Sequence, residues 1–167
     1  GACILSIRAD DPNAFAGLDA GKLNRVNLAR RAALTNWRDY TMNDRVQWCV
    51  VAIPSPAWTR TVFPDLPVEV GMEKLWELIF KVCRVNEKSD PVKNWEKHVA
   101  VMTAHAKQLN EWKLRSIHMT SANGTDLVIG LADDHIWESA ASRSEKGYEF
   151  MPNIPTEEVF TAPHRMH

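Results

Sequence analysis

The first two-thirds of the chain alternates short apolar runs with amphipathic segments, a pattern that predicts strands alternating with helices. The apolar run at 2–7 predicts a first strand and is followed by the turn sequence Asp10-Asp-Pro12. A second run at 46–53, rich in β-branched residues, predicts another strand. Between the two, Asp19 precedes a stripe of apolar or small residues at helical spacing, which predicts a helix. The stripe consists of Leu23, Val26, Ala29, Ala33 and Trp37.

Two further helices are predicted in the middle of the chain. Apolar residues at helical spacing between positions 72 and 83 indicate the first. The second begins at Asp90-Pro91, which has the form of an N-cap followed by proline at the first helical position. Its apolar residues recur at alternating spacings of three and four, which favours a packing surface over a binding site. They are Val92, Trp95, Val99, Met102, Ala106 and Leu109. The proline- and serine-rich stretch at 54–67 predicts a loop.

The last third of the chain changes to consecutive strands and turns. The segments at 115–119 and 126–131 predict two strands. They flank Ser121-Ala-Asn-Gly124, whose Asn-Gly pair favours a tight hairpin turn. Two shorter β segments are predicted at 148–150 and 158–162.

These patterns together predict an α/β fold in two parts. Residues 1–113 alternate strand and helix and form part of an N-terminal α/β domain, whereas residues 114–167 begin a β-rich domain. The composition, 45% hydrophobic and 25% charged, is that of an ordinary globular protein. The length is sufficient for one domain with a core, or for one domain and part of another.

Charge and cysteine usage exclude several classes of protein. The net charge is −1, and the 20 basic residues are interspersed with the acidic ones, so we expect no nucleic-acid partner. The longest apolar run, at 48–53, is too short to span a bilayer, so we expect no membrane partner. The cysteines are odd in number and widely spaced, which favours a reducing compartment, the cytoplasm, over a disulfide framework. They are Cys3, Cys49 and Cys83.

Histidines and common motifs give no strong local signal. His98 and His105 lie seven residues apart on the long predicted helix, too far for their side chains to share an ion, and we interpret both as solvated helix surface. His164 and His167 follow Pro163, where a loose terminus is the usual outcome. The chain contains no G-x-G-x-x-G, G-K-[ST], H-E-x-x-H, G-x-S-x-G or paired C-x-x-C motif, which removes the easily read nucleotide, zincin, hydrolase and zinc-ribbon assignments.

Two adjacent carboxylates, Glu157 and Glu158, lie in a β-prone run between prolines at 152, 155 and 163. Neighbouring side chains of a strand point to opposite faces, so one glutamate can face a cavity. Consecutive glutamates are most often surface charge, but the prolines restrict the backbone that would present a carboxylate. A divalent cation needs three or more ligands, and this stretch supplies only one or two.

The run 151–164, Met-Pro-Asn-Ile-Pro-Thr-Glu-Glu-Val-Phe-Thr-Ala-Pro-His, resembles the first metal-ligand motif of the aminopeptidase T family. These thermophilic-type metallo-aminopeptidases include the PepS and AmpS enzymes. The resemblance covers all 167 residues and its terminal motif is specific. Supporting matches are Ser6-Ile-Arg-Ala-Asp-Asp-Pro12, Tyr40-Thr-Met-Asn43, Trp48-Cys-Val-Val-Ala-Ile-Pro-Ser-Pro-Ala-Trp58, Glu73-Lys-Leu-Trp-Glu-Leu-Ile-Phe80 and Gly124-Thr-Asp-Leu-Val-Ile-Gly-Leu131.

The resemblance implies that the chain is a central fragment of longer enzymes, in which the segment 114–167 begins the metallopeptidase catalytic domain. The family's enzymes are cytoplasmic, usually dimeric exopeptidases that remove N-terminal residues from peptides with two divalent metal ions (Zn, Co, Mg or Mn). The motif implies that Glu158 is a metal ligand, with Glu157 as the fallback if the register differs by one. His164 is implied to lie near the site without being a ligand.

The other ligands of the family site belong to motifs after residue 167, so no catalytic residue is assigned. We therefore expect the fragment alone to be inactive and its metal sites to be unoccupied. A severed chain would expose apolar surface, so we also expect self-association or loose termini.

Two other functions remain open. The chain can be a non-enzymatic α/β scaffold or interaction domain that lost the metal site. It can also be a small α/β domain that binds a ligand unrelated to peptides, in a polar pocket away from Glu158.

Overall fold

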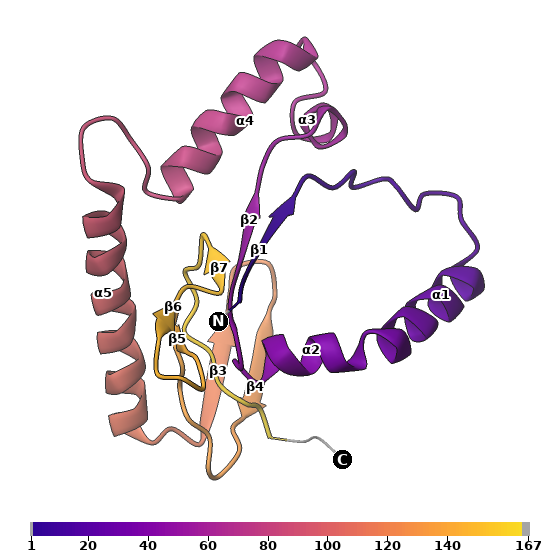
Figure 1. The fold of residues 1–167 in the computed structure, drawn as a ribbon. Helices are drawn as coiled ribbons and strands as arrows, with labels where there is room; N and C mark the ends of the chain where they lie inside the picture. Colours follow the sequence, from indigo (N-terminus) through magenta and orange to yellow (C-terminus); the bar gives the residue numbers. More distant parts are fainter. Residues whose placement is uncertain (1, 165–167) are drawn as a thin grey trace. The chain divides into compact units, whose positions relative to one another are not determined.

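The structure is a computed structural model that describes residues 2–164, and it has the mixed α/β fold expected from the sequence (Figure 1). The chain forms two compact units. One contains the described residues up to Pro91 together with Ser142–Pro155, and the other contains Val92–Ala141 and the described residues from Thr156 on. The division into an N-terminal α/β domain and a β-rich domain after residue 113 stays a prediction. Within residues 2–164, no helix is both long enough and apolar enough to cross a bilayer.

A three-stranded parallel sheet forms the centre of the first unit. The strands are β1 (Cys3–Arg8), β2 (Gln47–Ala52) and β7 (Asn153–Ile154), in the order β1-β2-β7. Leu5 is paired with Cys49, and Val50 with Asn153. The two predicted strands are confirmed with small shifts at their ends. The two-residue β7 was not predicted, because its partner lies about a hundred positions earlier in the chain.

Two helices connect β1 to β2, because parallel strands need a crossover connection. The helix α1 (Ala20–Ala33) begins after Asp19, whose carboxylate accepts a hydrogen bond from the Lys22 backbone N–H at 2.7 Å. It ends at Leu34, and α2 (Thr35–Met42) follows at once. The Thr35 hydroxyl donates to the carbonyl of Ala32 at 2.9 Å, a local bond that competes with a continuous helix. The single apolar stripe predicted across this region therefore lies on two helices.

The predicted loop at 54–67 is wrong in part, because it contains the helix α3 (Pro56–Val62). The Ser55 side chain accepts a hydrogen bond from the Trp58 backbone N–H at 3.1 Å, and Pro56 occupies the first turn. Serine followed by proline is an N-cap and N1 signal that the proline content obscured. The next helix, α4 (Val68–Val82), begins four residues before its first predicted apolar position.

The contact between α3 and α4 depends on Gly71. A Cβ atom at this position would lie 2.6 Å from the Cγ2 atom of Thr59, a residue that is 1% exposed. We expect Gly71→Ala to lower the free energy of unfolding by about 1–3 kcal/mol, the usual cost of overpacking a core, despite the better helix propensity of alanine. Thermal unfolding followed by circular dichroism measures this change. Adding Thr59→Ser removes the clashing methyl group, and a double variant no more stable than Gly71→Ala would contradict the explanation.

A short antiparallel hairpin completes the first unit. Its strands are β5 (Ser142–Arg143) and β6 (Glu149–Phe150). The hairpin is tied to the loop before β2 through the Asp44 carboxylate, which accepts hydrogen bonds from the Ser142 hydroxyl and, at 3.1 Å, from the Trp48 indole. The segment predicted at 148–150 is thus confirmed, whereas its partner β5 was not predicted.

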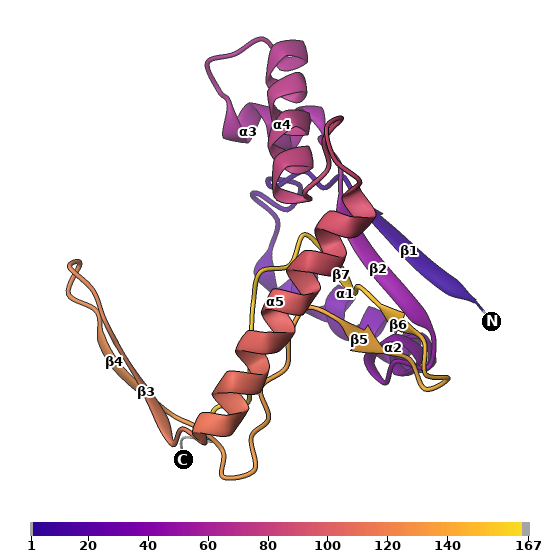
Figure 2. The same ribbon diagram turned by 90° about the vertical axis from the view of Figure 1, so that its left-hand side faces the viewer.

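The second unit is built around the helix α5 (Pro91–Trp112). It continues into the antiparallel strands β3 (Ser116–Thr120) and β4 (Asp126–Gly130), which form the predicted hairpin (Figure 2). The buried core of this unit contains Ala106, Leu131 and Trp137. Leu109, Leu114, Ile117 and Val159 pack against it. The apolar face predicted for the long helix is therefore a packing surface at Met102, Ala106 and Leu109, as expected, whereas Val92 at its start is exposed.

The strand predicted at 158–162 is wrong. The segment forms only two isolated bridges, between Glu138 and Phe160 and between Leu131 and Pro163. The two bridges are seven positions apart on one side and three positions apart on the other. The segment between Leu131 and Glu138 therefore loops out, and no continuous ladder can form. The segment is nevertheless anchored, because Phe160 and Glu138 exchange both backbone hydrogen bonds, at 2.9 and 3.1 Å.

Candidate functional site

The segment that carries the two glutamates leaves the core of the second unit between two anchored residues. Thr156 is 5% exposed, and Val159 packs against the core, whereas the side chains of Glu157 and Glu158 are exposed. Neither glutamate therefore faces the core. The segment displays both carboxylates on the surface of this unit.

The side chain of His98 on α5 holds the start of this segment. Its Nε2 atom lies 2.7 Å from the carbonyl oxygen of Thr156. Because a carbonyl oxygen only accepts hydrogen bonds, this geometry assigns the ring proton to Nε2. The same atom lies 3.7 Å from Oε2 of Glu157. The Trp95 ring meets the imidazole edge to face, with centroids 5.4 Å apart.

The interpretation of His98 as solvated helix surface is wrong, because its side chain is only 9% exposed. His105 is exposed, as expected. The two histidines have the same spacing from their apolar neighbours on α5, so the helical pattern alone does not separate them. His98 is buried and His105 is not because the chain returns to α5 at Thr156, next to His98.

The Glu158 carboxylate is held in its ionised form by its own segment. The backbone N–H of Glu157 donates to Oε2 of Glu158 at 3.1 Å, and this bond lowers the pKa of Glu158 below its usual value of 4.5. The backbone N–H of Glu158 and the Thr156 hydroxyl lower this pKa further, against partial desolvation and the repulsion of Glu157. At neutral pH, Glu158 is therefore an anion.

The segment can provide one of the ligands that a divalent cation needs. An ionised, exposed carboxylate suits hard and borderline cations, but an ion needs several such groups. Within the described residues 2–164, no group of three or more His, Cys, Asp or Glu side chains is placed to hold a metal. His98 donates its Nε2 proton to a carbonyl, so in this arrangement that nitrogen offers no lone pair to a metal. The segment can supply one carboxylate ligand to a metal ion, and the assignment of that ligand to Glu158 stays a prediction.

His164 is placed by its backbone at the end of β4. Its N–H donates to the carbonyl of Gly130 at 2.7 Å, next to the bridge between Leu131 and Pro163. The residue itself is exposed. Its proximity to a metal site stays a prediction, and His167 lies outside the described residues.

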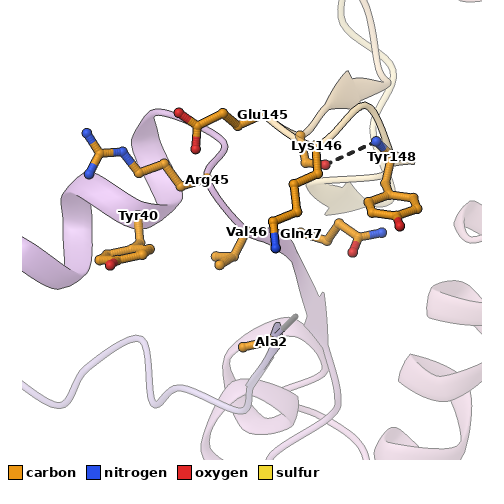
Figure 3. A pocket seen from close by; sticks show the side chains of 9 residues that line it. Ala2, Tyr40, Arg45, Val46, Gln47, Glu145, Lys146 and Tyr148 are labelled. Carbon is orange, nitrogen blue, oxygen red and sulfur yellow. Dashed lines mark hydrogen bonds between the residues drawn. The ribbon is translucent and has the colours of Figure 1, made fainter.

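The first unit contains a cavity of about 580 Å³. Its lining comes from the end of α2, the start of β2 and the hairpin of β5 and β6 (Figure 3). Arg45 is already paired with Asp39 at 2.7 Å, and its guanidinium lies 5.8 Å from the centre of the Tyr40 ring. Tyr40 belongs to one of the sequence matches that support the resemblance, but none of Glu157, Glu158 and His164 lines this cavity. The lining residues are Ala2, Tyr40, Arg45, Val46, Gln47, Ser144, Glu145, Lys146 and Tyr148.

Comparisons with known proteins agree with the resemblance seen in the sequence. The family model described as thermophilic metalloprotease (M29) matches residues 1–167. Aminopeptidase PepS of Streptococcus thermophilus is 42% identical over 160 residues, which cover 95% of this chain and 38% of the relative. Aminopeptidase T of Thermus aquaticus is 39% identical over 165 residues, which cover 99% of this chain and 40% of the relative.

A solved structure extends the similarity to the fold. Wild-type AmpT from Thermus thermophilus matches with a TM-score of 0.88 at 36% identity, covering 99% of this chain and 40% of that one. The chain thus spans about two fifths of the length of the relatives it matches. The fold of this part is shared along nearly the whole chain.

Proposed function

The chain belongs to the thermophilic metalloprotease family M29, and from that premise we propose that residues 1–167 form part of a metal-dependent aminopeptidase. In this proposal Glu158 is a metal ligand of an enzyme that hydrolyses N-terminal residues from peptides. The observation that carries it is the Glu158 carboxylate, exposed and ionised on a segment anchored at both ends. The aminopeptidase names of the relatives support the reaction class.

Within this proposal the chain has a limited chemical task. Divalent ions, when bound, supply Lewis-acid activation of water and polarisation of the scissile carbonyl. Glu158 contributes one negative oxygen ligand, and the anchored backbone keeps that ligand in place. The number of ions, two, and their identity, Zn, Co, Mg or Mn, are part of the proposal. So are a peptide substrate, a homodimeric enzyme and a cytoplasmic location, which the small and odd number of cysteines suits.

The proposal is tested by comparing the chain alone with a hybrid enzyme, in which residues 1–167 replace the matching segment of aminopeptidase T from Thermus thermophilus. Hydrolysis of amino-acid p-nitroanilides is measured with added cobalt or zinc. We expect activity from the hybrid enzyme and none from the chain alone, because one carboxylate does not complete a metal site. Activity of the isolated chain would contradict the single-ligand account. A hybrid enzyme that folds but neither binds metal nor hydrolyses substrate would favour a non-enzymatic scaffold.

A further inference from the structure

The hydrogen bond between His98 and Thr156 joins the long helix to the segment that carries Glu158. We propose that His98 is a positioning residue, which fixes the backbone from which Glu158 projects by donating its Nε2 proton to the Thr156 carbonyl. This inference rests on the proposed role of Glu158 as a metal ligand. His98 acts through Thr156 and takes no part in the chemical step.

Burial makes this hydrogen bond difficult to replace with water. The His98 side chain is 9% exposed and Thr156 is 5% exposed, with 2.7 Å between Nε2 and the carbonyl oxygen. If the imidazole is removed, the Thr156 carbonyl loses its donor in a place that water reaches poorly. The edge-to-face contact with Trp95 fixes the plane of the imidazole and so aims Nε2 at the carbonyl.

Thr156 is the residue through which this restraint reaches the carboxylate. Its carbonyl is bound by His98, and it directly precedes Glu157 and Glu158 in the chain. The N–H of Glu157, the next residue, donates to Oε2 of Glu158. Fixing the position of Thr156 therefore restrains the backbone of residues 156–158 and, with it, the orientation of the Glu158 carboxylate. This is the arrangement by which residues behind a ligand tune a metal site.

The segment has a second anchor that does not involve His98. After Glu158, Val159 packs on the core and Phe160 exchanges two backbone hydrogen bonds with Glu138. Loss of His98 should therefore loosen residues 156–158 while residues from 160 on stay paired. A local effect of this kind separates positioning from a general contribution to folding.

The first test uses the 167-residue chain without metal. Amide hydrogen exchange is compared among the native chain, His98→Leu and His98→Gln. Glutamine places an N–H at a similar distance from the backbone as the histidine Nε2, whereas leucine fills the space without a donor. We expect exchange of the Glu157 and Glu158 amides to accelerate by about five- to tenfold in His98→Leu, the factor that corresponds to one hydrogen bond. The Phe160 amide should be unchanged, and His98→Gln should resemble the native chain.

The second test uses the hybrid enzyme loaded with zinc or cobalt. We expect His98→Leu to lose metal to a chelator at about 10–100-fold lower chelator concentration, with His98→Gln recovering most of the native retention. His105→Leu, an exposed histidine on the same helix, is the matched control and should retain metal like the native hybrid. If leucine prevents folding, the glutamine variant decides: segment exchange or metal loss well above native would overturn the role.

These outcomes separate the inference from the function on which it rests. A native hybrid enzyme that binds no metal contradicts the ligand role of Glu158, while the exchange experiment still measures whether His98 holds Thr156. A hybrid that binds metal equally well with histidine and leucine at position 98 overturns the inference alone. Unchanged exchange of the Glu157 and Glu158 amides in His98→Leu overturns it as well.

Discussion

Replacing Glu158 by alanine in the hybrid enzyme is expected to lower kcat/KM by more than about a hundredfold. Changes behind a metal ligand already cost about 10–100-fold in metal affinity or activity, and removal of the ligand itself should cost more. Glu158→Gln should fail similarly, because the neutral amide lacks the charge that the lowered pKa of Glu158 preserves. The loss should appear in metal content, measured by elemental mass spectrometry, as well as in hydrolysis of amino-acid p-nitroanilides.

The matched control for this prediction is the neighbouring carboxylate. Glu157→Ala also removes an exposed carboxylate, but it leaves the backbone N–H that donates to Glu158. We therefore expect only a small loss of metal content and of kcat/KM. A large loss with Glu157→Ala and normal activity with Glu158→Ala would shift the ligand by one residue. Normal metal content in both variants would contradict a ligand in this segment.

The fold was readable from the sequence where long apolar patterns decide the structure. The runs that form β1 and β2, and the stripe that forms α5, predict these elements to within about three residues, because burial alone requires such spacing. The two-residue strand β7 has no such pattern. It exists because a parallel partner is available beside β2, and a local window contains no information about that partner.

Local capping explains a second group of differences. Thr35 bonds back to the turn before it and separates α1 from α2, and Ser55 caps α3 inside a stretch that prolines mark as a loop. Both signals are present in the sequence. They involve one hydroxyl each and were outweighed by apolar spacing in the first case and by proline content in the second.

For the candidate site too, local sequence patterns predicted some residues, whereas others depend on tertiary contacts. The pair of glutamates and its prolines could be identified from the sequence, and the family resemblance singled out Glu158. His98 could not be separated from His105, because both follow an apolar residue of α5 by three positions. Only the return of the chain to α5 at Thr156 distinguishes them. In the proposed site, the orientation of Glu158 thus depends on a residue about sixty positions earlier in the chain.

Asn110 should give the second large effect, this time on stability. Its side chain brackets the backbone of Trp137, accepting from the Trp137 N–H at 2.8 Å and donating to the Trp137 carbonyl at 3.0 Å. Trp137 is 8% exposed and forms the core with Ala106 and Leu131. Asn110→Ala leaves both backbone groups without these partners, so we expect the free energy of unfolding to fall by about 2–4 kcal/mol. Urea unfolding followed by circular dichroism measures the loss.

Asn110→Asp separates the two halves of this bracket. A carboxylate still accepts from the Trp137 N–H, but it places a second oxygen against the Trp137 carbonyl, which lacks a donor in this variant. Its stability at neutral pH should therefore stay well below that of the native chain. Gln108→Ala, an exposed change on the same helix, should alter stability by less than about 0.5 kcal/mol. If Asn110→Ala were as stable as Gln108→Ala, the bracket would not be what fixes the 131–138 segment against which the Glu158 segment is anchored.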